Sequence, residues 1–244
     1  MKNILITGSG RGIGAAIARR LSREDNVRIF INYRKSKDSA IKLQNEIRQK
    51  GIDCIAYKCD ISNPYDVKNM FEDIQKKFKG IDVLINNAGI SKTGLFQDMN
   101  FEEWNELFSV NVNGVFNTVK AALPYMLANN YGRILNFSSI WGHNAASCEV
   151  GYSATKGAIE AFTRSLAAEL APSNIYINAI APGSVKTSMM NDFSDDDIKS
   201  IENNIPMMRM ASPEEIAEIA AFLISDNNSY MTGQIITVDG GFCL

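Results

Sequence analysis

A glycine-rich turn between a short apolar run and a helical segment constrains the fold of this chain more than any other feature. Residues 7–14 read TGSGRGIG and directly follow the apolar residues 4–6. Glycines permit positive φ angles and close backbone approach. The start of the following helix directs N–H groups and the positive end of its dipole into the turn. The segment is typical of a pyrophosphate site in a dinucleotide-binding fold, although helix–strand packing alone can also require glycines.

Strand-length apolar runs alternate with helical patterns along the rest of the chain. The runs cover residues 3–7, 27–33, 54–59, 83–86, 133–137, 176–180 and 235–238. Several are apolar throughout, as strands buried on both faces of a parallel sheet are. Helical spacing marks residues 13–21, 41–47, 67–78, 104–127, 152–170 and 213–224. The alternation predicts the α/β class: a Rossmann-type doubly wound sheet of about seven parallel strands with helices on both faces.

Two features concern the organisation of the chain. No compositional break or Gly/Ser linker divides residues 1–244, so we expect a single domain. Residues 186–210 are polar, Met-rich and weakly periodic, and Ser194 is followed there by three aspartates. The segment reads either as a solvated connection whose short helix has an acidic first turn, or as a mobile lid over a pocket. The length of the insertion favours the substrate lid.

Composition excludes several classes of protein and site. Lys and Arg total 25 against 27 Asp and Glu, which argues against binding to nucleic acid or to an anionic membrane. No run of 18 apolar residues and no signal-peptide core occur, so we expect a cytoplasmic protein without membrane contact. Because His143 is the only histidine, a multi-imidazole metal site or a Ser-His-Asp triad is nearly excluded, and no metal is predicted. The cysteines at 54, 59, 148 and 243 match no zinc spacing and read as reduced thiols.

The end of the second predicted strand indicates which dinucleotide would bind. Enzymes that use NAD place an acid about 20 residues after the glycine turn, where it binds the ribose 2′-hydroxyl. Here Arg34 and Lys35 occupy that region, and no acid is present to repel a 2′-phosphate. Together with Arg11, they could attract one, so the sequence favours NADP(H) over NAD(H). The alternative is that these are merely exposed charges on a loop.

Polar residues also follow the third and fourth strands. A carboxylate at Asp60 could accept the adenine amino group or cap the turn before Pro64, and the two roles are compatible. Residues 86–89 read NNAG, and small polar residues there let the backbone lie against a cofactor.

A tyrosine and a lysine four residues apart form the candidate acid–base pair. Tyr152 and Lys156 share one face of a predicted helix. A phenol has a pKa of about 10, and a nearby ammonium is expected to lower it. Ser139 lies thirteen residues earlier at the carboxyl end of a predicted parallel strand, where doubly wound sheets keep their ligands. A tyrosine and a lysine at this spacing are common in helices without any function. The position of Ser139 is what favours a catalytic role for the pair.

Over essentially its whole length, the chain resembles the short-chain dehydrogenase/reductase family. The matching motifs are the turn at 7–14, Asp60, residues 86–89, Asn111, Ser139, Tyr152, Lys156, Pro182 with Gly183, Thr187 and residues 238–241. The resemblance implies a catalytic tetrad of Asn111, Ser139, Tyr152 and Lys156.

Within that tetrad the resemblance gives each residue a role. Tyr152 protonates the substrate carbonyl oxygen and Ser139 hydrogen-bonds it. Lys156 binds the nicotinamide ribose and lowers the Tyr152 pKa, and Asn111 holds a proton-relaying water. Thr187 and the backbone near Val185 hold the carboxamide.

The expected contacts follow from these roles. Those with the cofactor NADP(H) are Gly8, Ser9, Arg11, Gly12, Ile13, Gly14, Tyr33, Arg34, Lys35, Asp60, Ile61, Asn87, Ala88, Gly89, Tyr152, Lys156, Pro182, Gly183, Val185 and Thr187. Those with the substrate are Ser139, His143, Glu149 and Tyr152. His143 reads equally as a loop residue.

The substrate remains open between two resemblances. The chain is broadly similar to 3-oxoacyl-acyl-carrier-protein reductases, yet it has Asn130 and Ser173 where those enzymes present arginines to their acidic carrier protein. Residues 138–142 and 146–150 resemble elongation factor P 5-aminopentanone reductases, which act on a protein substrate. Glu149 could pair with a substrate amine there, or it is a helix-start acid that the dipole favours.

Two other functions compete with ketone reduction, and the resemblance also implies an oligomeric state. The rivals are a non-catalytic NADP(H) sensor, which usually lacks a tetrad residue, and an alcohol dehydrogenase that runs the oxidation. The resemblance also implies a homotetramer packed through the helices at 104–127 and 152–170 and through the last strand. Small residues on those helices would permit close approach, but ordinary packing on the sheet explains them as well.

Overall fold

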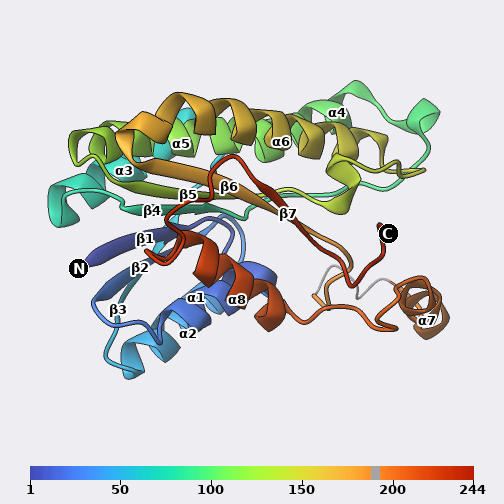
Figure 1. Cartoon of the computed structure of the whole chain (residues 1–244), viewed down its shortest axis with the longest axis horizontal. Helices are drawn as coiled ribbons and strands as arrows, with labels where there is room; N and C mark the ends of the chain where they lie inside the picture. Colours follow the sequence, from blue (N-terminus) through green and yellow to red (C-terminus); the bar gives the residue numbers. More distant parts are fainter. Residues whose placement is uncertain (188–192) are drawn as a thin grey trace.

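The computed structural model describes residues 1–187 and 193–244, which build one seven-stranded parallel sheet (Figure 1). The strand order is β3-β2-β1-β4-β5-β6-β7. The strands are β1 (Lys2–Ile6), β2 (Val27–Tyr33), β3 (Asp53–Lys58), β4 (Val83–Asn86), β5 (Gly132–Phe137), β6 (Ile175–Pro182) and β7 (Ile235–Val238). Every neighbouring pair is parallel, which confirms the predicted fold class.

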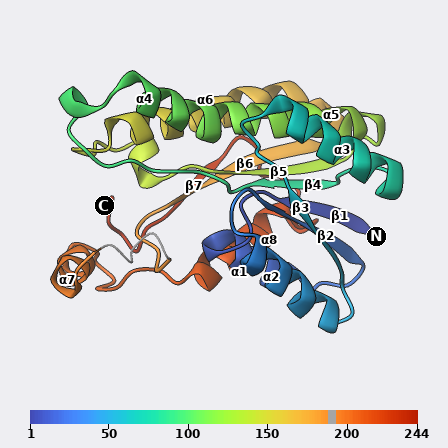
Figure 2. The same ribbon diagram turned by 180° about the vertical axis from the view of Figure 1, so that it is seen from behind.

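Helices cover both faces of the sheet, as Figures 1 and 2 show from opposite sides. One face carries α1 (Gly12–Leu21), α2 (Lys37–Gln49) and α8 (Pro213–Ile224). The other carries α3 (Pro64–Phe78), α4 (Phe101–Phe108), α5 (Gly114–Ala128) and α6 (Val150–Leu170). Helix α7 (Asp195–Asn203) lies outside these layers, on the side where the chain ends.

The apolar strands are buried because successive side chains enter different cores. On β1, Ile4 and Ile6 pack with α1, α2 and α8, whereas Leu5 packs with α3, α5 and α6. On β2, Ile29 and Ile31 pack in the same core as Ile4 and Ile6, whereas Phe30 packs in the same core as Leu5. A strand covered on both faces is therefore apolar at most of its positions.

One predicted helix is interrupted. The pattern over 104–127 predicts a continuous helix, but α4 ends at Phe108 and α5 begins at Gly114. A π-helical turn, Ser109–Asn113, joins them. Such turns are rare and concentrate at functional sites, and this one contains Asn111. Hydrogen bonds from the Asn111 side chain, described below, outweigh the local helical pattern.

The long connection after β6 is only partly described. Of the predicted lid at 186–210, residues 188–192 lie outside the described residues, and movement of the segment stays a prediction. The acidic helix expected there is α7, where Ser194 and Asp197 form a reciprocal cap. Its Glu202 pairs with Lys186 at 3.1 Å. None of the helices in the described ranges is long and apolar enough to span a bilayer.

Candidate active site

The predicted site residues gather at the carboxyl ends of the strands, where the strand order changes direction. Chain connections run outward from β1 toward β3 on one side and from β4 toward β7 on the other. In doubly wound sheets, a crevice for ligands opens at this switch point. The loops that follow β1 to β6, the π-helical turn and helix α6 supply the residues described next.

The glycine turn lies tightly against the loop that follows β4. Gly8 has a φ of 62°, and a Cβ atom there would stand 2.8 Å from the Cα of Ala88. The Asn87 side chain donates hydrogen bonds to the carbonyl oxygens of Thr7 and Gly8, at 2.9 and 3.2 Å. A side chain at residue 8 would therefore separate the two loops.

The start of α1 is suited to an anionic group. Arg11, the residue before the helix, makes no side-chain capping bond, and the first turn holds no acid. The first N–H groups of a helix lack partners within the helix, so this end offers donors and a positive dipole to a pyrophosphate. Thr187 lies beside the turn, since a Cβ atom at Gly12 would be 3.6 Å from its methyl group. The arrangement fits a dinucleotide.

Arg34 and Asp60 meet across the ends of β2 and β3. Arg34 Nε lies 2.9 Å from Asp60 Oδ2, and the two side chains are 46% and 26% exposed. The other carboxylate oxygen accepts hydrogen bonds from the backbone and hydroxyl of Ser62. Asp60 therefore caps the turn before Pro64, which is one of the two roles predicted for it; the other, binding of the adenine amino group, stays a prediction. Within residues 1–187 and 193–244, the other two guanidinium nitrogens of Arg34 have no hydrogen-bond partner, so a role in binding a ligand stays a prediction.

Several residues predicted to contact cofactor have buried side chains. Tyr33 and Ile61 belong to the cores on opposite faces of the sheet. Val185 is also buried and forms a bridge to Ala211. Gly183 N donates to Val238 O, at 2.9 Å, next to Pro182 at the end of β6. Contacts from these positions to a cofactor stay predictions.

Ser139, Tyr152 and Lys156 come together from two elements. Ser139 follows β5 and starts the short 3-10 turn Ile140–Gly142, while the other two lie on α6. The Ser139 hydroxyl lies close enough to the Tyr152 hydroxyl to influence its pKa. Lys156 Nζ donates to Phe137 O at 2.7 Å and lies 5.4 Å from the centre of the Tyr152 ring. The geometry places two hydroxyls and an ammonium at one point.

The pKa values of the pair follow burial. Burial raises the pKa of Tyr152 to about 12; the Ser139 hydrogen bond opposes this rise, and the Glu149 charge adds to it. Burial lowers the pKa of Lys156 to about 8. The expected lowering of the Tyr152 pKa is therefore wrong for the protein alone, because desolvation of the phenolate dominates. The phenol is protonated at neutral pH and is ready to act as an acid.

Asn111 clamps the β4 loop to the catalytic helix. Its Oδ1 accepts from Ile90 N at 2.8 Å, and its Nδ2 donates to Ile90 O and Thr155 Oγ1 at 2.9 and 3.0 Å. A Cβ atom at Gly89 would be 3.3 Å from Asn111 Oδ1 and 3.6 Å from Lys156 Nζ, so the glycine lies beside both groups. The water-holding role of Asn111 stays a prediction.

Glu149 and His143 occupy different surroundings. Glu149, just before α6, accepts hydrogen bonds from Thr93 Oγ1 at 2.8 Å and Ser91 Oγ at 3.2 Å. Both ring nitrogens of His143 have partners: Nδ1 lies 2.7 Å from Glu160 Oε1, and Nε2 lies 3.4 Å from Thr237 Oγ1. Substrate contacts by either residue stay predictions.

Sequence reasoning missed the residues that support the site. Thr155 holds Asn111, while Glu160 holds His143 and Ser138. Glu160 could have been noticed in the sequence. It is an acid four residues after Lys156, so the two side chains share one face of the helix. The hydroxyls that hold Glu149 carry none, because they lie almost 60 residues earlier.

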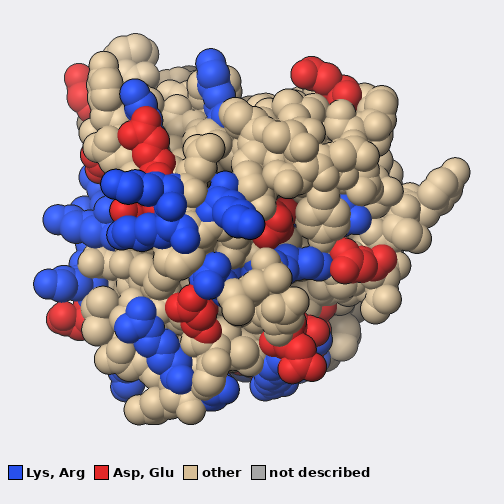
Figure 3. Space-filling model, turned by 90° about the vertical axis from the view of Figure 1, so that its left-hand side faces the viewer, with Lys and Arg blue, Asp and Glu red and all other residues tan. Residues whose placement is uncertain are grey.

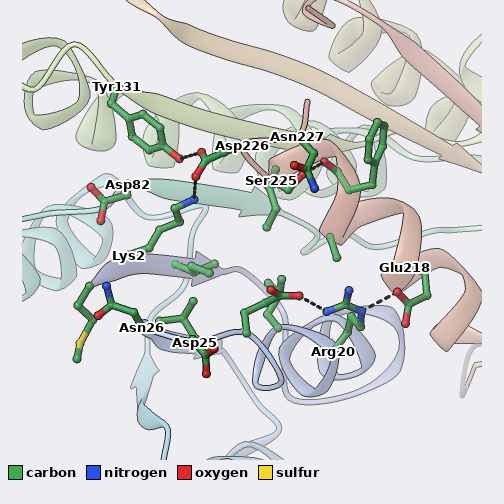
Figure 4. Close-up of a pocket in the computed structure, with 18 residues that line it drawn as sticks. Lys2, Arg20, Asp25, Asn26, Asp82, Tyr131, Glu218, Ser225, Asp226 and Asn227 are labelled. Carbon is green, nitrogen blue, oxygen red and sulfur yellow. Dashed lines mark hydrogen bonds and ion pairs between the residues drawn. The ribbon is translucent and has the colours of Figure 1, made fainter. Parts of the chain in front are cut away.

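A hollow lies away from these residues, at the amino ends of the strands. It measures about 820 Å³ and is bordered by β1 and the ends of α1 and α8 (Figure 4). Some of its polar groups bind one another: Asp226 contacts Lys2 and Tyr131, and Arg20 contacts Glu218. Figure 3 shows the side of the molecule marked by the N-terminus in Figure 1, where basic and acidic side chains intermingle.

Two remaining expectations concern metal and thiols. Over residues 1–187 and 193–244, no three His, Cys, Asp or Glu side chains are grouped so that they could hold a metal ion. The cysteines at 54, 59, 148 and 243 are free thiols.

Comparisons with known proteins agree with this geometry. A family model described as Enoyl-(Acyl carrier protein) reductase matches residues 8–243. A 3-oxoacyl-[acyl-carrier-protein] reductase from Staphylococcus epidermidis is 38% identical over 240 residues, which are 98% of each chain.

Two solved structures are similar over nearly the whole chain. The 3-oxoacyl-[acyl-carrier protein] reductase from Brucella melitensis has a TM-score of 0.93 at 33% identity, covering 100% of this chain and 91% of that one. A variant of actinorhodin polyketide ketoreductase with NADPH has a TM-score of 0.93 at 31% identity, covering 99% and 97%.

Proposed function

This chain belongs to the short-chain dehydrogenase/reductase family, and on that premise we propose that it reduces a ketone with NADPH, using Tyr152 as the proton donor. The observation that carries the proposal is that the Ser139 and Tyr152 hydroxyls come together beside the buried ammonium of Lys156. A non-catalytic sensor would have no need for this constellation.

The residues of the site divide the work of the reaction. A bound reduced nicotinamide supplies a hydride to the carbonyl carbon. Tyr152 transfers its hydroxyl proton to the carbonyl oxygen, so that the C=O group becomes CH–OH. Ser139 donates a hydrogen bond to the same oxygen as negative charge develops there. Lys156 stabilises the phenolate left on Tyr152, which then regains a proton from solvent.

The proposed substrate is a 3-oxoacyl thioester, which gives the 3-hydroxy product. Support comes from the relatives in Staphylococcus epidermidis and Brucella melitensis, whose names state that reaction. The test follows NADPH absorbance at 340 nm with acetoacetyl-coenzyme A and identifies the product by mass spectrometry. We expect one 3-hydroxybutyryl product for each NADPH consumed. Tight NADPH binding without oxidation by this or any other ketone would instead identify a sensor.

Arg34 is proposed to bind the 2′-phosphate of NADPH. Replacing it with Asp removes the guanidinium and adds a carboxylate, so the ratio of kcat/KM for NADPH to that for NADH should fall roughly 100-fold. Steady-state kinetics with both nucleotides measure this ratio. Arg23→Asp is the matched control, since Arg23 is an exposed arginine just after α1 whose guanidinium lies 4.0 Å from Glu218 of α8. An unchanged ratio in Arg34→Asp would refute this account of cofactor choice.

A second candidate substrate is an amino-ketone, such as the 5-aminopentanone modification on elongation factor P. The specific observation is Glu149, whose partners among the described residues are two hydroxyls rather than a cation and whose charge acts on Tyr152. A carboxylate there attracts an ammonium and repels an anion.

This candidate makes Glu149→Gln a discriminating variant. It should raise KM roughly tenfold for a 5-aminopentanone-lysine substrate and leave KM for acetoacetyl-coenzyme A unchanged or lower. Glu102→Gln, at the exposed start of α4, is the control. Equal effects of Glu149→Gln on both substrates would eliminate the amine-binding role.

The proposal includes an assembly of four copies, which the family resemblance implies. Supporting it, large apolar side chains are exposed on three helices: Phe116 and Leu127 on α5, Val150 on α6 and Phe222 on α8. Burial of such side chains is the usual driving force of association.

A further inference from the structure

A buried acid next to the catalytic residues takes no part in the chemistry above. Glu160 lies on α6, one helical turn beyond Lys156 and two beyond Tyr152, and it is only 3% exposed. Burial of a carboxylate is costly unless charged or hydrogen-bonding partners compensate for the lost water. The partners of Glu160 therefore indicate why an acid is present there.

Two donors share one oxygen of Glu160. His143 Nδ1 lies 2.7 Å and Ser138 Oγ 3.0 Å from Oε1. Because an ionised carboxylate only accepts hydrogen bonds, Nδ1 carries the hydrogen and the serine hydroxyl points toward the acid. The second oxygen faces Arg164 at the longer distance of 3.7 Å, and that arginine is 55% exposed.

The two donors lie at the two ends of the segment that holds Ser139. Residues 138–143 leave β5, form the short turn Ile140–Gly142 and end at His143. His143 also reaches Thr237 on β7, at 3.4 Å. Glu160 thus ties both ends of the segment to the catalytic helix, and the imidazole links it to the neighbouring strand.

Residues 138–143 pack tightly against Glu160 and α6. A Cβ atom at Gly142 would be 2.6 Å from both Glu160 Oε1 and Ser138 Oγ. A Cβ atom at Gly157 would be 3.2 Å from Gly142 O, so the turn lies directly on α6. Within the turn, Trp141 N donates to Ser139 Oγ, at 3.3 Å. A shift of the segment would therefore move the Ser139 hydroxyl.

We propose that Glu160 is a positioning residue that fixes the Ser139 hydroxyl relative to Tyr152 by holding Ser138 and His143. The inference rests on the proposed function, because it assigns a role in the same ketone reduction. Ser139 and Tyr152 come from different elements and must meet one carbonyl oxygen. Charge-assisted hydrogen bonds are roughly twice as strong as neutral ones, so an acid holds this geometry better than a neutral side chain would.

The test compares two substitutions of Glu160 with a control. Glu160→Leu keeps a similar volume but removes the acceptor, and misplacement of a catalytic group by about 1 Å costs roughly 100-fold in rate. We expect kcat for ketone reduction to fall by that factor, while KM for NADPH stays within about twofold because the partners of Glu160, Ser138 and His143, are not among the predicted cofactor contacts. Glu160→Gln retains one acceptor oxygen and should recover kcat to within about fivefold of wild type. Arg164→Met, which removes only the distant exposed partner, should leave kcat unchanged.

The outcomes separate this inference from its premise. Absence of ketone reduction in the wild-type enzyme contradicts the proposed function itself. An active wild type with full kcat in folded Glu160→Leu overturns the positioning role alone, and equal losses in kcat and NADPH affinity assign Glu160 to general stability. If Glu160→Leu does not fold, as thermal melting will report, His143→Ala replaces it. That variant removes one donor and should lower kcat roughly tenfold without changing KM for NADPH, whereas unchanged kcat would overturn the role.

Discussion

Tyr152→Phe is expected to lower the rate of ketone reduction roughly 1000-fold while NADPH still binds, because general-acid catalysis contributes about that factor. The substitution removes one oxygen and keeps the buried ring in place. Ser139 remains as a hydrogen-bond donor, but an aliphatic hydroxyl is a far weaker acid than a phenol and does not replace Tyr152 as the proton donor. Steady-state oxidation of NADPH and a fluorescence titration of NADPH binding measure the two quantities.

The matched control for this variant is Tyr65→Phe. Tyr65 lies in the first turn of α3 and is 76% exposed, so loss of its hydroxyl should leave the rate unchanged. A rate for Tyr152→Phe within about fivefold of wild type would show that the proton comes from another group.

Lys156→Met is expected to lower kcat/KM roughly 100-fold and to change the shape of the pH profile. Burial lowers the pKa of Lys156 to about 8. The ammonium is therefore present below pH 8 and is lost above it, so wild-type kcat/KM should fall about tenfold per pH unit beyond that point. Tyr152, with a pKa raised to about 12, stays protonated across this range and does not cause the decline.

The measurement is kcat/KM from pH 6 to pH 10 for wild type and variant. In Lys156→Met, the residual activity should lose the decline near pH 8. Lys68→Met removes an exposed lysine of α3 and should reproduce the wild-type profile. A wild-type profile that is flat to pH 10, or a decline that survives in Lys156→Met, would show that this ammonium is not required.

The parallel sheet could be predicted because the apolar composition of each buried strand is visible within the strand's own segment of sequence. Strands buried on both faces are apolar at most positions, and the runs at 27–33 and 83–86 match the buried strands β2 and β4 to the residue. The run at 235–238 likewise matches β7, an edge strand that is only partly buried. The start of α8 could also be predicted from the sequence. Ser212 and Glu215 form the reciprocal cap that their spacing predicts, with Pro213 in the first turn.

The site was predictable where function depends on spacing along one helix, as for Tyr152 and Lys156. It was not predictable where distant segments meet. The π-helical turn at Asn111 depends on contacts with Ile90 and Thr155, and no local pattern reports them. The shift of the Tyr152 pKa was expected with the wrong sign, because a sequence shows a neighbouring charge but not the burial that outweighs it.

The most direct test of the central claim is to follow hydrogen from cofactor to product. Wild-type protein is incubated with acetoacetyl-coenzyme A and NADPH that carries two deuterium atoms at C4 of the nicotinamide, and the product is analysed by mass spectrometry. The account predicts one deuterium atom on the carbinol carbon and none on the hydroxyl oxygen, whose hydrogen comes from Tyr152 and exchanges with water. A hydroxy product without deuterium, or labelled NADPH that binds and is never consumed, would contradict it.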